Sequence, residues 1–232
     1  VRALIQLSVP RLPRSPFRPS AGFARMAEKH FIHFHYFQEP GVADGELDAR
    51  PAEFLAKIFH ALGGDGNYLA CWQHPSQGNG YLDVLPEAPD LPWSWLSTDE
   101  FDHYVDEFTR TGFTGGLNWY RAEDLVWEQT EHTRDLPIAV PTAFIAGAAD
   151  PVLTMMGRTA LDAMAELVPG LQSTTLVPGA APTRLPRTSG SEAPNTPMTC
   201  AAAGESKPPG RPMARRMSCS CIQMSRGRLL SR

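Results

Sequence analysis

The sequence predicts an α/β fold in which a parallel sheet is interrupted by a helical insertion. Two observations indicate the sheet: a short apolar segment opens the chain at Val1–Val9, and a strand–helix–strand pattern occupies residues 138–177. Two strands joined by a helix are typical of a parallel crossover, so the second pattern favours parallel pairing. A third observation indicates the insertion, because the residues between these segments carry helical patterns and no strand pattern.

The first third of the chain is expected to contain one strand, one loop and two helices. Residues 1–9 are apolar and bounded by Pro10, as in a buried strand. Four prolines between Pro10 and Pro19 cannot continue a helix and predict a loop. Residues 21–37 can be helical until Pro40-Gly41 breaks the pattern. Residues 54–62 then repeat apolar side chains at helical spacing.

The middle of the chain begins with a long irregular segment. Residues 64–92 are rich in Gly, Pro, Asn and Asp, which is typical of a lid or binding loop. Ser97 and Glu100 form a capping box, in which the serine oxygen accepts a backbone N–H and the glutamate reaches back. A helix is therefore expected after Ser97, and a further helix over residues 117–131.

The strand–helix–strand unit places an acidic residue at a strand end. We expect a buried strand over residues 138–147, a helix near residues 161–168 and a last strand over residues 174–177. Asp150 follows the first of these strands. An acid just beyond the carboxyl end of a parallel strand is well placed for catalysis, although Asp150-Pro151 is also a common turn or helix cap.

Charge divides the chain into two unequal parts. Residues 181–232 hold nine Lys/Arg against two Asp/Glu, a net charge of +7, so residues 1–180 hold 12 against 23, a net charge of −11. The basic part contains no Phe, Trp or Tyr. Such a segment buries too little apolar surface to offset its chain entropy, so we expect a disordered tail. Weak phosphate binding by its basic side chains is the alternative, but base stacking would need aromatic residues, so no nucleic-acid partner is expected.

Cysteine usage and hydropathy predict a reducing, cytoplasmic setting. Cys71 stands alone in the body of the chain, and Cys200, Cys219 and Cys221 lie in the tail, which is no disulfide framework. No apolar run approaches the roughly 18 residues of a membrane span. The Arg-rich, acid-poor start resembles an organelle transit peptide, but the apolar pattern of its first nine residues favours a core strand.

Four segments carry a resemblance to a known family. Residues 110–121 (RTGFTGGLNWYR) and 36–44 (YFQEPGVAD) closely resemble the two lid signatures of soluble epoxide hydrolases of the α/β-hydrolase superfamily, especially the bacterial type. Residues 140–154 (VPTAFIAGAADPVLT) look like the strand that carries the triad acid, and residues 1–10 (VRALIQLSVP) like the strand after the nucleophile helix. Together they cover roughly residues 1–180 in the order of the family.

The resemblance implies a partial α/β-hydrolase sheet with a helical lid, or cap. Residues 1–10 would be a core strand, 11–136 the lid, 137–180 the last part of the core, and 181–232 the tail. It also implies a small-molecule epoxide substrate, a vicinal diol product and neither metal nor organic cofactor. The sequence leaves the oligomeric state open, with a homodimer as one option.

In such enzymes an aspartate attacks an epoxide carbon, lid phenols donate to the epoxide oxygen, and a histidine held by an acid activates water. A phenol with a pKa of about 10 stays protonated at neutral pH and can donate to an alkoxide. By resemblance, Tyr120 is the second lid phenol and Asp150 is the triad acid. Outside these motifs, a core tyrosine and a turn or cap aspartate would be the ordinary interpretations.

The position of the first lid phenol is occupied by a histidine. His33 lies three residues before Tyr36, where the family has a tyrosine, and a neutral imidazole can donate one N–H instead. Tyr36 lies one helical turn away and is the other candidate donor. Trp119, Phe37, Gln38 and Tyr36 are expected to contact substrate because of their places in the lid motifs.

Two catalytic groups of the family are not found in the sequence, so we expect a chain truncated at both ends and inactive alone. The strand–turn–helix elbow with the nucleophilic aspartate would precede Val1. The catalytic histidine would follow Ala180 in a Gly-His-Trp sequence, where this chain has Ala181-Pro182-Thr183. All seven histidines precede Asp150.

Two rival functions remain open. One is another α/β-hydrolase such as a dehalogenase, although a departing halide needs other donors than a lid phenol. The other is a non-catalytic product. A metal site at His30, His33 and His35 is not expected, because only the first two would share a helical face and no carboxylate pattern accompanies them.

Overall fold

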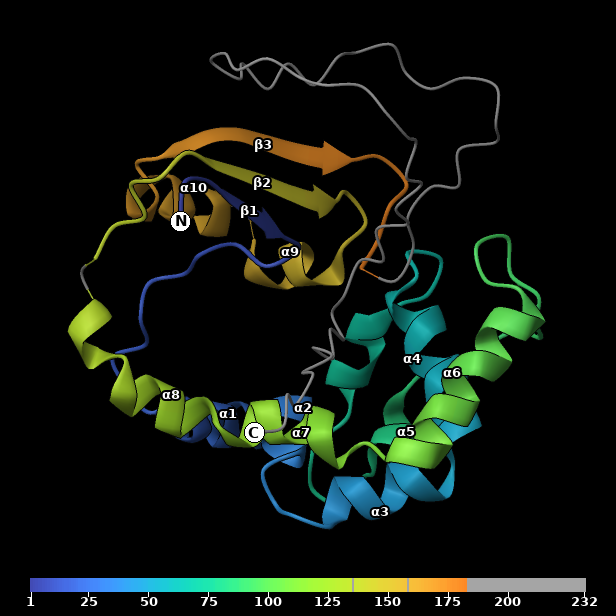
Figure 1. Cartoon of the computed structure of the whole chain (residues 1–232). Coiled ribbons are helices and arrows are strands. Elements are labelled where there is room, and N and C mark those ends of the chain that lie inside the picture. Colours follow the sequence, from blue (N-terminus) through green and yellow to red (C-terminus); the bar gives the residue numbers. More distant parts are fainter. Residues whose placement is uncertain (135, 158, 183–232) are drawn as a thin grey trace, which may run out of the picture.

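The computed structural model describes residues 1–134, 136–157 and 159–182, and the predicted tail lies outside this range apart from its first two residues. Three parallel strands form one sheet in the order β1 (Leu4–Leu7), β2 (Thr142–Gly147), β3 (Leu171–Val177). Leu4 pairs with Thr142, and Thr142 pairs with Leu171. The strand at the start of the chain thus joins the same parallel sheet as the two strands near the end of the described chain, which confirms the predicted parallel sheet (Figure 1).

Two helices follow the central strand and cover one face of the sheet (Figure 1). They are α9 (Pro151–Met156) and α10 (Thr159–Leu167). Phe144 of β2 is fully buried against Met164 and Val168, in a small core of its own. The opposite face is less covered, since Ile5 and Leu7 of β1, which pair with Ala143 and Ile145, stay about half exposed.

The remaining helices form a separate block with a larger core (Figure 1). Its α-helices are α1 (Pro19–Ala27), α2 (His33–Tyr36), α3 (Val42–Ala49), α4 (Pro51–Leu62), α5 (Tyr81–Val84), α6 (Thr98–Thr111), α7 (Thr114–Arg121) and α8 (Glu123–Gln129). Two 3-10 helices join them, η1 (Tyr68–Gln73) and η2 (Glu131–Thr133). No helix within the described ranges is long and apolar enough to cross a membrane.

The capping box confirms one predicted helix start. The Ser97 hydroxyl accepts the backbone N–H of Glu100 at 3.3 Å, and the Glu100 carboxylate accepts the backbone N–H of Ser97 at 3.0 Å. Helix α6 begins at the next residue, Thr98. These two bonds satisfy backbone donors that the first turn of a helix otherwise leaves unpaired.

The predicted single helix over residues 21–37 is wrong. Helix α1 ends at Ala27, and the chain is extended at Ile32 before α2 begins. A second segment takes over the backbone bonds here: the Ser76 hydroxyl donates to His30 O at 2.9 Å and accepts the N–H of Ile32 at 3.1 Å. Phe31 is fully buried in the gap, so long-range packing overrides the local helical pattern.

Two other parts of the helical block differ from what the sequence predicts. The expected helix over residues 117–131 is divided at Ala122 into α7 and α8. The sequence did not predict helix α3, which starts after Gly41, a residue with φ of +87°. The carboxylate of Asp44 accepts the backbone N–H of Gly41 at 2.9 Å and so caps this helix.

Candidate active site

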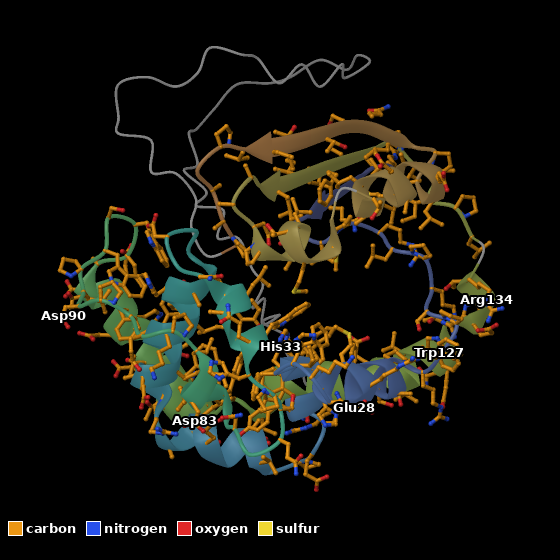
Figure 2. All side chains as sticks on the ribbon, turned by 180° about the vertical axis from the view of Figure 1, so that it is seen from behind. Glu28, His33, Asp83, Asp90, Trp127 and Arg134 are labelled. Atoms are coloured by element: carbon orange, nitrogen blue, oxygen red, sulfur yellow. The ribbon has the colours of Figure 1, made fainter. Side chains whose placement is uncertain are left out.

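His33 begins helix α2 and is surrounded by aromatic rings. The ring of Tyr81 stacks on the imidazole at 6.0 Å between centroids and 7° between planes. Phe34 and Phe37 lie 4.3 and 5.6 Å away. Desolvation by these neighbours lowers the pKa of His33 from 6.5 to about 3, so the imidazole is neutral near pH 7. Figure 2 shows His33 at the edge of the helical block that faces the sheet.

Tyr120 from helix α7 meets the same group of rings. Its ring lies 5.7 Å from that of His33 at 82°, and 5.0 Å from that of Phe37 at 68°. The side-chain amide of Gln38 donates to Phe34 O at 2.7 Å and to Tyr120 O at 3.0 Å. Segments 36–44 and 110–121 are therefore held together by an amide bridge and by edge-to-face aromatic contacts.

A buried ion pair holds α7 against the start of α3. Arg121 pairs with Asp44, and its Nε donates to Phe37 O at 2.8 Å. The Thr114 hydroxyl donates to the same carboxylate at 2.6 Å. The Arg121 guanidinium holds the pKa of Asp44 well below its usual range. Arg121, the residue after Tyr120, thus fixes the position of Tyr120 relative to Phe37 through its bonds to Asp44 and to Phe37 O.

Two tyrosines that the sequence did not single out join the site. The Tyr68 hydroxyl lies 2.6 Å from Nδ1 of His33 and 3.0 Å from the Tyr81 hydroxyl. Burial raises the pKa of both phenols, so both carry their protons. Burial likewise raises the pKa of the neighbouring Cys71 thiol to about 11. These residues lie in the irregular segment between α4 and α6, where no motif distinguishes one aromatic residue from another.

Asp150 lies at the carboxyl end of β2 and is almost fully buried. One carboxylate oxygen accepts the Ser8 hydroxyl at 2.6 Å, and the other accepts the backbone N–H of Val152 at 2.8 Å. Asp150 thereby caps helix α9, so the cap alternative describes its local geometry correctly. A carboxylate with two acceptor oxygens, each engaged once, can still accept a further N–H.

The helical block contacts the sheet close to Asp150. Helix α9 packs against η1, which carries Tyr68. A Cβ atom built on Gly64 would lie 3.4 Å from Cβ of Ala149 and 3.2 Å from Cβ of Ala181. Pro182, the residue after Ala181, is buried beside this contact.

The other predicted residues divide into two groups. Phe37 is buried within the ring cluster, and Gln38 bridges its helices. The hydroxyl of Tyr36 is engaged outside this cluster, because it donates to the Glu46 carboxylate at 2.9 Å. Burial and the nearby Glu46 raise the pKa of the Tyr36 phenol. Trp119 is 78% exposed.

A surface hollow further distinguishes Tyr36 and Gln38 from His33 and Tyr120. An open hollow of about 580 Å³ is lined in part by Tyr36 and Gln38, whereas His33 and Tyr120 do not line it. No group of three or more His, Cys, Asp or Glu side chains in the described residues could hold a metal ion.

Comparison with known proteins gives consistent matches at the level of sequence. No family model matches the chain. Epoxide hydrolase A of Mycobacterium tuberculosis is 45% identical over 181 residues, which are 78% of this chain and 55% of that protein. Epoxide hydrolase 1 of Siraitia grosvenorii is 38% identical over 159 residues, 68% of this chain and 47% of that protein. The chain thus spans about half the length of the curated relatives that it matches.

Solved structures give the same result. Epoxide Hydrolase A from Mycobacterium thermoresistibile has a TM-score of 0.67 at 47% identity, over 78% of this chain and 55% of that one. An epoxide hydrolase from an endophytic Streptomyces has a TM-score of 0.70 at 36% identity, over 78% of this chain and 54% of that one.

Proposed function

Because this chain is homologous to epoxide hydrolases of the α/β-hydrolase fold, we propose that it supplies the lid and the triad acid of an enzyme that adds water to an epoxide. The product would be a vicinal diol, and the helical block would be the lid. The juxtaposition of Tyr120, from one lid motif, with His33, three residues before the other, carries this proposal, because their rings lie edge to face.

Tyr120 and His33 would activate the epoxide oxygen. When a nucleophilic carboxylate opens the ring, negative charge develops on this oxygen, and donors already in place stabilise it without reorganisation. A phenol and a neutral imidazole each offer one hydrogen at neutral pH. The low pKa of His33 supports this role, because it keeps the imidazole neutral near pH 7. An imidazolium in the same position would carry a charge that is costly to remove from water.

Asp150 would orient a histidine that then activates water against the ester intermediate. Its carboxylate is buried and already held by two donors, which fix its orientation. The histidine must come from elsewhere, since all seven histidines of the 232-residue sequence precede Asp150 and Pro182 occupies the family's position. We therefore propose that this chain by itself does not turn over epoxides.

Substrate contacts would come from the lid motifs. Phe37 would provide apolar surface beside the two donors, and Gln38 would hold their helices together. Tyr36 and Trp119 would act only at the margin, because Tyr36 is bonded to Glu46 and Trp119 faces outward.

A hybrid enzyme tests the proposal. The matched stretch of the Mycobacterium tuberculosis enzyme would be replaced by residues 1–180 of this chain, so that the relative supplies the rest. We expect turnover of styrene oxide, and Tyr120→Phe should lower kcat by about 10²–10³-fold, as the loss of one positioned donor does. Tyr104→Phe, in the partly exposed face of α6, is the matched control and should leave kcat unchanged.

Three results would contradict parts of this proposal. A folded hybrid that hydrolyses a haloalkane but no epoxide would favour the dehalogenase alternative. A hybrid that is indifferent to Tyr120→Phe would remove the phenol from the mechanism. Turnover of styrene oxide by the purified 232-residue chain above the buffer rate would show that the chain needs no other part.

A further inference from the structure

The hydrogens of three side chains in the helical block, the buried Tyr68 and Tyr81 and the partly buried His33, can be assigned by counting donors and acceptors. Tyr68 lies between His33 and Tyr81, with its hydroxyl 2.6 Å from Nδ1 of the imidazole and 3.0 Å from the other hydroxyl. The two phenols are protonated and the imidazole is neutral, so the group holds three hydrogens. The free choice is which ring nitrogen of His33 carries its hydrogen.

One arrangement places the imidazole hydrogen on Nδ1. The imidazole then donates to Tyr68, and Tyr68 donates to Tyr81. The hydrogen of Tyr81 is left without an acceptor among the described residues, where Tyr68 is the only side-chain partner of this hydroxyl. An unsatisfied buried hydroxyl is costly, so this arrangement is disfavoured.

A variant of this arrangement uses the thiol of Cys71, which lies beside Tyr68. Tyr68 could donate to its sulfur while it accepts from both His33 and Tyr81. A thiol sulfur is a weak acceptor, whereas an imidazole nitrogen is a good one. The phenolic hydrogen of Tyr68 therefore belongs with Nδ1.

The remaining arrangement uses both phenolic hydrogens well. Tyr81 donates to the oxygen of Tyr68, and Tyr68 donates to Nδ1 of His33. The imidazole hydrogen then sits on Nε2, which has no hydrogen-bond partner among the described residues. The stacked ring of Tyr81 and the edge-on ring of Tyr68 also limit rotation of the imidazole.

We infer that Tyr68 is a positioning residue, whose hydroxyl donates to Nδ1 of His33 and thereby fixes the tautomer that carries its hydrogen on Nε2. The purpose of this arrangement rests on the proposed function: Nε2–H would be the donor that complements Tyr120 at the epoxide oxygen. In many functional histidines a backbone carbonyl or carboxylate accepts a hydrogen bond from Nδ1–H and so fixes the hydrogen on Nδ1. Tyr68 also fixes the tautomer through Nδ1, but because it donates to this nitrogen, the hydrogen lies on Nε2.

Nitrogen NMR of the 232-residue chain with ¹⁵N-labelled histidine tests the inference directly. The His33 signals would be identified by their loss in His33→Phe. We expect an unprotonated Nδ1 that accepts a hydrogen bond and a protonated Nε2 at pH 7. In Tyr68→Phe the Nδ1 resonance should move to the position of a nitrogen without a hydrogen bond, and the other tautomer should gain population.

Tyr81→Phe is the matched control, since it removes an outer hydroxyl but keeps the stacked ring. Here the hydrogen should remain on Nε2. A wild-type spectrum with the hydrogen on Nδ1 would overturn the inference, and so would a Tyr68→Phe spectrum identical to that of the wild type. If circular dichroism shows that Tyr68→Phe does not fold, the wild-type spectrum alone decides.

These measurements do not depend on catalysis. If the hydrogen lies on Nε2 as expected but the hybrid enzyme has no turnover, the proposed function fails and the role of Tyr68 in fixing the tautomer stands. If the hybrid is active but the hydrogen lies on Nδ1, only the inference about Tyr68 fails.

Discussion

The helical block and the sheet each bury one carboxylate, and they compensate it differently. Asp44 in the helical block has a guanidinium partner, Arg121. Asp150 in the sheet region has only neutral donors in the described parts of the chain, the Ser8 hydroxyl and the N–H of Val152. Burying a charge costs free energy unless the charge is paired. Asp44 is paired with Arg121, so this acid needs no further partner. The second retains acceptor capacity, which its proposed role beside a histidine would use.

Breaking the Asp44–Arg121 pair should have the largest effect on stability. In Arg121→Met the carboxylate stays buried without its cation, and removing one partner of a buried pair costs about 3–5 kcal/mol. Both side chains keep about an eighth of their surface exposed, 12% and 13%, so we expect about 3 kcal/mol. Chemical denaturation would measure the loss.

The matched control for this pair is Arg110→Met. Arg110 also pairs with an acid, Glu107, but lies on the surface of α6, where water screens the pair. We expect no measurable change. Equal losses in the two variants would mean that burial does not distinguish the pairs, and the contrast with Asp150 would lose its basis.

Removing a donor from Asp150 should have the next largest effect, and it should appear in the other region. Ser8→Ala leaves the carboxylate with one donor fewer, and hydrogen bonds to charged groups contribute about 1.5–3 kcal/mol. Native-state hydrogen exchange should show weaker protection in β1 and β2 and unchanged protection in α4 and α6. A uniform loss across both regions would mean that they unfold as one unit.

A glycine variant separates the hydrogen bond from the backbone at this position. Ser8 has a φ of +65°, in the left-handed region that glycine adopts without steric cost. Ser8→Gly removes the same hydroxyl as Ser8→Ala but relieves the backbone. We therefore expect Ser8→Gly to be the more stable of the two variants by about 1 kcal/mol.

The sequence predicts the sheet region better than the helical block, for a physical reason. The strands and the acid after β2 are recognised from local apolar patterns, as is, within the helical block, the capping box at Ser97. The break before His33 depends on Ser76, a residue 43 positions further along, which accepts and donates the backbone bonds that a helix would use. Side-chain contacts of this range leave no trace in local periodicity.

The candidate site divides in the same way. The family resemblance singles out Tyr120, Asp150, Phe37 and Gln38 within its motifs, and His33 three residues before one of them. Tyr68 and Tyr81 lie in an irregular segment, and only the folded chain brings them to the imidazole. A count of aromatic residues in that segment would have indicated a packed loop, but not which of them contacts His33.

The last predicted effect is a dependence of stability on pH, which belongs to the helical block and is absent near neutral pH. His33 has a pKa of about 3 when folded, below the ordinary value of 6.5 that applies to the unfolded chain, so the unfolded chain binds one more proton between these limits. Stability must then fall as the pH falls below 6.5, by at most about 1.4 kcal/mol per pH unit, and the loss levels off near pH 3. His33→Phe keeps an aromatic ring and removes the proton, so its unfolding free energy should change less between pH 7 and 5 than that of the wild type. Equal changes in the two chains would mean that His33 is in contact with water. The reason for treating its imidazole as a permanently neutral donor would then be lost. The geometry of the Asp150 carboxylate does not depend on this result.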